Sequence, residues 1–158
     1  MLLLFYFFLL FSFYSFIYSF NYRVIKTPIF HFTSLIKQHH IVIVKPKNKR
    51  GLYAIDFTPV KQNNFKTYIY LLLGINIPAE IRVRYILNDI NINDDENKIQ
   101  EKWNKDSIVV NPASSYYPVF ELQKRKTKWR EPNYMYLYKH NCQHFSNELV
   151  EIIKKMKY

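Results

Sequence analysis

Residues 141–156 have the sequence NCQHFSNELVEIIKKM, and this stretch decides how the chain folds. Its apolar side chains recur at steps of three and four residues, as a helix with one apolar face requires: Phe145, Leu149, Ile152, Ile153 and Met156. Asn141 is a good N-cap, because its side-chain oxygen can accept a free backbone N–H of the first turn. The sequence therefore predicts an amphipathic helix that begins at Cys142.

Cys142 is the only cysteine among the 158 residues. An intrachain disulfide is impossible, and a zinc site with several cysteines is excluded. At the first position of a helix, a thiol lies among free backbone N–H groups at the positive end of the helix dipole, which stabilise a thiolate. The same N–H groups can form an oxyanion hole. Position alone leaves two interpretations, a nucleophilic thiol and a buried structural cysteine.

A thiol nucleophile needs a base, and the nearest histidine in the sequence is badly placed. His144 lies roughly 200° around the helix from Cys142 at about 100° per residue. We therefore expect His144 to have a structural role at the start of the helix, and we look for the base elsewhere in the chain.

A hairpin in the first third of the chain provides candidates for the base and for a carboxylate that orients it. Residues 39–44 are rich in β-branched side chains, residues 45–51 are turn-like, and residues 52–57 resume a strand pattern. In the simplest register of this hairpin, His40 and His39 face Phe57 and Asp56. Which histidine points inward depends on the register.

The remaining pattern is that of an α+β domain with an antiparallel sheet. Further strands are predicted at residues 68–73, 81–87 and 134–138, and a short helix at residues 96–103. Residues 104–133 contain three prolines and show no clear period.

The first twenty residues form an apolar leader without a charged side chain, long enough to cross a bilayer as a helix. A targeting signal is favoured over a retained membrane anchor, and a buried element of the domain is disfavoured. We therefore divide the chain into a leader, 1–22, and one domain, 23–158. The expected location is a membrane, the secretory pathway or an organelle.

The formal net charge is +11. A basic surface of this kind is either simply solvated or attracted to anionic lipid head groups. Nucleic-acid binding is disfavoured, because no signature of a nucleic-acid-binding fold accompanies the basic residues.

The box Asn141–Leu149, NCQHFSNEL, resembles the cysteine box of the circularly permuted papain-like enzymes. These include the lecithin:retinol acyltransferase-like family, with the box N-C-E-H-F, and the PPPDE peptidases, with a box close to N-C-N-H-F-S-x-E-L. In this superfamily a histidine opens an early strand and the cysteine follows at a helix N-terminus, an order similar to His40 and Cys142. The resemblance implies a permuted papain-like fold, with an antiparallel sheet packed against the helix that carries the nucleophile.

The implied function is that of a cysteine-dependent hydrolase or acyltransferase that forms an acyl-thioester from an amide, thioester or ester. The expected roles are Cys142 as nucleophile, His40 as base with His39 as the alternative, Asp56 as orienting carboxylate, Tyr138 as oxyanion donor, and Asn141 and His144 as oxyanion or structural support. This chemistry requires no metal and no cofactor. The expected substrates are acyl lipids or peptides and isopeptides, and an anionic membrane surface is a possible partner. The alternative is a catalytically silent protein of the same fold, acting as a membrane-associated interaction or lipid-binding module.

Overall fold

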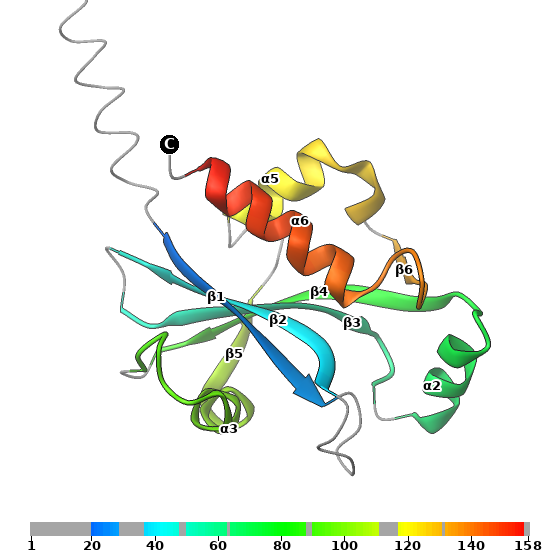
Figure 1. The fold of residues 1–158 in the computed structure, drawn as a ribbon, viewed down its shortest axis with the longest axis horizontal. Coiled ribbons are helices and arrows are strands. Elements are labelled where there is room, and N and C mark those ends of the chain that lie inside the picture. Colours follow the sequence, from blue (N-terminus) through cyan, green and yellow to red (C-terminus); the bar gives the residue numbers. More distant parts are fainter. Residues whose placement is uncertain are drawn as a thin grey trace, which may run out of the picture.

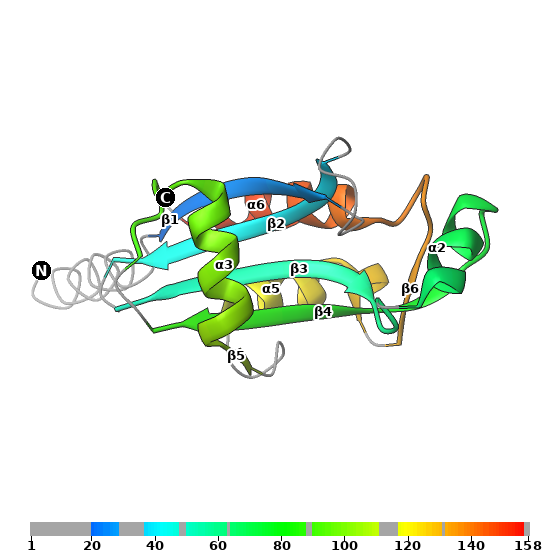
Figure 2. The same ribbon diagram turned by 90° about the horizontal axis from the view of Figure 1, so that it is seen from below.

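The computed structural model describes residues 20–28, 37–47, 50–62, 64–87, 90–110, 117–130 and 132–156. This part of the chain forms a six-stranded antiparallel sheet with helices on both of its faces (Figures 1 and 2). The prediction of an α+β fold with an antiparallel sheet is therefore confirmed. Most of the predicted leader lies outside the described residues. No helix in the described ranges is long and apolar enough to cross a membrane.

The sheet has the order β1-β2-β3-β4-β5, and β6 pairs with β4 beside this path. The strands are β1 (Phe20–Pro28), β2 (Lys37–Pro46), β3 (Leu52–Pro59), β4 (Ile77–Ile86), β5 (Ser107–Val110) and β6 (Asn133–Met135). The helices are α2 (Phe65–Leu72), α3 (Glu96–Asp106), α5 (Tyr117–Arg125), the short 3₁₀ helix η1 (Thr127–Trp129) and α6 (Cys142–Lys155). Helices α5 and α6 cover one face of the sheet, and α3 crosses the other (Figures 1 and 2).

The predicted hairpin and the predicted C-terminal helix are both confirmed. Strands β2 and β3 pair in antiparallel register, with Ile41 opposite Asp56 and Val44 opposite Tyr53. Helix α6 packs against both of these strands. The elements that were expected to carry Cys142, the two histidines and Asp56 are therefore neighbours in space.

Strand β1 begins earlier than the domain that we expected from the sequence. It starts at Phe20, so its first three residues fall in the range assigned to the leader. Phe20 is only 6% exposed and belongs to the core beneath α6, and the strand pairs with β2 along its length. The apolar run of the leader ends at Phe20, and the first charged residue, Arg23, lies inside β1, so the change in composition falls within the strand and not before it.

The prediction of a strand at residues 68–73 is wrong, because residues 65–72 form the helix α2. The side chain of Asn64 accepts a hydrogen bond from the backbone N–H of Lys66 and caps this helix. Its buried residues are Thr67 and Leu71, four positions apart, which is helical spacing. The many β-branched and aromatic side chains suggested a strand, whereas the cap and the tertiary packing select a helix.

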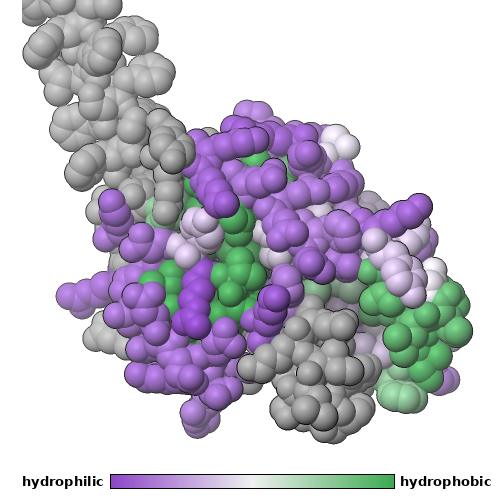
Figure 3. Space-filling view, viewed as in Figure 1, coloured by the Kyte–Doolittle hydropathy of each residue, from purple (hydrophilic) through white to green (hydrophobic). Residues whose placement is uncertain are grey.

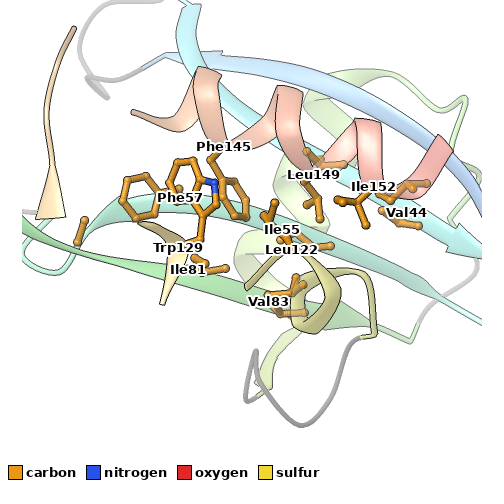
Figure 4. Close-up of a cluster of buried hydrophobic side chains, with 14 of the residues drawn as sticks. Val44, Ile55, Phe57, Ile81, Val83, Leu122, Trp129, Phe145, Leu149 and Ile152 are labelled. Atoms are coloured by element: carbon orange, nitrogen blue, oxygen red, sulfur yellow. The ribbon is translucent and has the colours of Figure 1, made fainter. Parts of the chain in front are cut away.

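The core beneath α6 fixes the helix on the sheet. Phe57 of β3, Trp129 of η1 and Phe145 of α6 pack in edge-to-face and tilted contacts, with ring centroids 5.1–5.9 Å apart (Figure 4). Farther along the helix, Leu149 and Ile152 are also buried over the sheet (Figure 4). Because this aromatic cluster lies at the first turns of α6, it holds the N-terminus of the helix near β2 and β3.

Candidate active site

The N-terminus of α6 is capped by Asn141, as the sequence predicts. The side-chain oxygen of Asn141 accepts hydrogen bonds from the backbone N–H groups of Gln143 and His144, each 3.0 Å long. The ring of His144 is also 2.8 Å from this oxygen, and the amide nitrogen of Asn141 donates to the carbonyl of Leu137 at 2.6 Å. Asn141 and His144 therefore hold the start of the helix in place.

His39 is the residue that connects Cys142 to Asp56. Its Nε2 atom lies 3.0 Å from Oδ2 of Asp56, and the same imidazole makes a side-chain hydrogen bond to Cys142. The residue lies in β2 two positions before Ile41, where the pairing with β3 begins, and Thr27 of β1 lies opposite it. The structure thus brings together three side chains from three elements: His39 of β2, Asp56 of β3 and Cys142 of α6.

His40, the base favoured from the sequence, lies elsewhere. Its Nδ1 atom is 3.2 Å from the hydroxyl of Ser146, which is fully buried in α6. Consecutive side chains of a strand point to opposite sides, so only one of the two histidines can reach Asp56. The expected pairing of Asp56 with His40 is therefore corrected, and Asp56 pairs with the alternative base, His39.

A second residue holds Asp56, and sequence reasoning missed it. Arg82 of β4 lies directly opposite Asp56 in the register of β3 and β4, and its guanidinium is 3.2 Å from the same Oδ2 atom. Asp56 is only 1% exposed, so its charge depends on these two partners. The sequence predicts a strand at residues 81–87 but does not single out Arg82. Arg82 could be identified only from the pairing of β3 with β4, which places it opposite Asp56, and the sequence does not reveal this register.

The pKa shifts of this cluster follow from its burial and its charges. Burial alone would raise the pKa of Asp56, but the hydrogen bond to His39 and the nearby charges of His39, Arg82 and Arg84 lower it. Burial would lower the pKa of His39, but the hydrogen bonds to Asp56 and Cys142 and their negative charges raise it to about 9. At neutral pH, Asp56 is therefore a carboxylate and His39 an imidazolium.

The pKa of His40 is shifted in the opposite direction. Its pKa is lowered by burial first, and further by the positive charges of Lys26 and His39. The neutral ring of His40 suits the contact with the Ser146 hydroxyl, whereas the neighbouring His39 carries a positive charge.

Tyr138, the expected oxyanion donor, is not brought into this cluster. It lies in the turn before α6 and is 74% exposed. The backbone N–H of Cys142 itself, at the first position of α6, is the donor nearest to the thiol along the chain.

An open cavity of about 510 Å³ lies on one side of the cluster. Its lining includes Arg82 and residues of the loop that follows β3: Val60, Lys61, Gln62 and Asn64. Since Arg82 contacts Asp56, this cavity borders the charged cluster. Among the described residues, no group of three or more histidine, cysteine, aspartate and glutamate side chains is arranged to hold a metal ion.

Comparisons with protein-family models, with curated proteins and with solved structures found no match to this chain.

Proposed function

We propose that the protein is a cysteine-dependent hydrolase or acyltransferase, with Cys142 as nucleophile, His39 as its proton partner and Asp56 as the orienting carboxylate. The observation that carries this proposal is that one imidazole hydrogen-bonds both the thiol at a helix N-terminus and a buried carboxylate. A permuted papain-like fold is part of the proposal, supported by the order of an early strand with the histidine and a later helix with the cysteine.

The raised pKa of His39 indicates how the thiol is activated. An imidazolium beside sulfur stabilises the thiolate by charge, and the N-terminus of α6 adds the positive end of its dipole. The proton then rests on His39 before substrate binds, and Asp56 holds the ring in the orientation that serves Cys142.

In the first half-reaction, the thiolate attacks the carbonyl carbon of an ester, thioester or amide. A sulfur–carbon bond forms, and the carbonyl oxygen becomes an oxyanion near the backbone N–H of Cys142. When this intermediate collapses, the bond to the leaving group breaks, and the leaving group takes the proton from His39. The product is an acyl-thioester on Cys142.

In the second half-reaction, the acyl group passes to water or to another acceptor. Once the sulfur is acylated, it no longer offers His39 a negative charge, and this contribution to the raised pKa disappears. The ring, which has given its proton to the leaving group, therefore stays neutral and can accept a proton from the attacking water or acceptor. One histidine thus serves as acid in the first step and as base in the second.

An activated ester such as p-nitrophenyl acetate tests this proposal on the full chain. We expect release of p-nitrophenolate together with an acetyl adduct on Cys142, seen by mass spectrometry and removed by hydroxylamine. His39→Ala should lower the rate by about 10²–10⁴-fold, whereas the matched variant His40→Ala should retain it. Nitrophenolate release without a Cys142 adduct would contradict the proposal and leave the catalytically silent binding module as the function.

A further inference from the structure

Helix α2 is unusual because large apolar side chains lie on its outer face. Phe65, Ile69 and Leu72 recur at steps of four and three residues and are 65%, 39% and 65% exposed. Leu73 and Ile75 continue the apolar surface beyond the helix and are 69% and 47% exposed. These five residues are called the α2 patch below.

The α2 patch is contiguous, and it forms one end of the molecule. Figure 3 shows hydrophobic residues gathered at the place where Figure 1 has α2, beside a surface that is largely hydrophilic. Apolar surface that is gathered in this way, rather than scattered, marks a contact with another partner. The helix itself needs only Thr67 and Leu71 to pack on the domain, so packing does not account for the outer apolar face.

The charges around the patch indicate the partner. Residues 57–79 contain no aspartate and no glutamate, and both of their charged residues, Lys61 and Lys66, are exposed. Lysines that flank a stripe of large apolar and aromatic side chains are typical of a surface that lies at the interface of an anionic bilayer. A second copy of the chain is disfavoured, because pairing the patches would bring lysines together in a protein with a net charge of +11.

The patch lies close to the entrance of the candidate active site. The loop that leads from β3 into α2 lines the cavity that reaches Arg82. On the other side of α2, the side chain of Asn76 donates a hydrogen bond to the hydroxyl of Tyr136, which lies in the connection from β6 to Cys142. A partner that contacts the α2 patch would therefore lie near the end of the molecule where α6 begins.

We propose that the α2 patch inserts into the surface of an anionic lipid bilayer, with Lys61 and Lys66 at the level of the head groups. The apolar contact supplies the affinity, and the lysines select the negatively charged surface. This docking surface does not depend on the thiol chemistry, so either proposal can fail without the other.

Quenching of a tryptophan by brominated lipid tests this docking directly on the full chain. The two native tryptophans, Trp103 and Trp129, are buried and give a constant background. The test variant is Leu73→Trp, and the control is Val109→Trp on β5, at an exposed apolar residue away from α2. In vesicles of phosphatidylserine and brominated phosphatidylcholine, we expect loss of fluorescence at position 73 and none at position 109.

A second pair of variants tests the contribution of the apolar face. In the Leu73→Trp background, Leu72→Glu should reduce the quenching, whereas Val109→Glu, at a site with the same 65% exposure, should not. Replacing phosphatidylserine by phosphatidylcholine should also reduce it. Because the readout is local, it reports on the patch even if another segment anchors the chain to the vesicle.

Equal quenching at positions 73 and 109 would overturn the proposal. An unquenched tryptophan at position 73 with a blue-shifted emission, together with sedimentation as a dimer, would assign the patch to a second copy of the chain. Strong quenching at position 73 without an acetyl adduct on Cys142 would retain the docking surface and reject the enzyme.

Discussion

The surroundings of His39 and of His40 differ sharply, although the two residues are adjacent in β2. His39 contacts a buried carboxylate and the thiol, and its pKa is raised to about 9. His40 contacts the hydroxyl of Ser146 beneath α6, and its pKa is lowered. The same side chain is therefore a cation in one place and a neutral ring in the other.

The difference shows that the partner, and not burial alone, decides the charge of an imidazole. Burial lowers the pKa at both positions, and at His39 it is outweighed by Asp56 and Cys142. The region of His39 thus holds a buried charged cluster, whereas His40 contacts α6 where the helix docks on the sheet. Three changes should break this contrast: removal of Asp56, deprotonation of His39 at high pH, and replacement of either histidine.

The largest loss of stability is expected from Asp56→Ala. The substitution leaves the imidazolium of His39 and the guanidinium of Arg82 partly buried without their shared carboxylate, and such a loss typically costs about 3–5 kcal/mol. Denaturant unfolding of the full chain in mild detergent measures it. The control is Ser146→Ala in the His40 region, where the loss of a neutral hydrogen bond should cost about 1 kcal/mol. Equal losses in the free energy of unfolding for the two variants would contradict the difference between the surroundings of His39 and His40.

A smaller effect is expected when the pH is raised. The pKa of His39 is higher in the folded protein, about 9, than its ordinary value of 6.5, so folding favours the bound proton. This stabilisation is complete below pH 6.5 and is lost as the pH rises through 9. Its upper limit is about 3–4 kcal/mol, because each tenfold gain in proton affinity on folding contributes about 1.4 kcal/mol.

Thermal unfolding at pH 7 and pH 10 measures this loss. The wild-type protein should lose more stability between these values than His39→Gln, whose side chain does not titrate. His40→Gln should lose as much as the wild type, because the pKa of His40 is not raised. A His39→Gln variant with the full wild-type pH dependence would show that His39 carries no bound proton in the folded state.

The elements that the sequence predicted well are those with strong local signals. Helix α6 has a cap residue and an apolar face with helical spacing, and both appear within sixteen residues. The hairpin of β2 and β3 has two β-branched runs around a turn. Cys142 could be identified because it begins the predicted helix, and Asp56 because it lies on the second strand of the predicted hairpin.

The features that the sequence did not reveal depend on contacts between distant segments. The choice between His39 and His40 depends on the register of β2 against β3 and on the place where α6 begins. The role of Arg82 depends on its position opposite Asp56 in a third strand. The sequence predicts a strand in place of helix α2 because aromatic and β-branched side chains are frequent there, and three of these, Phe65, Ile69 and Tyr70, lie on the exposed side of the helix.

The rate at which Cys142 is alkylated by iodoacetamide, followed from pH 5 to pH 10, shows whether His39 activates the thiol. The full chain in mild detergent is compared with His39→Ala and His40→Ala. If His39 and Cys142 form the activated pair, the wild type and His40→Ala react rapidly at pH 6, and His39→Ala loses this reactivity. Rapid reaction of His39→Ala at pH 6, or a loss of reactivity confined to His40→Ala, would show that His39 does not activate Cys142.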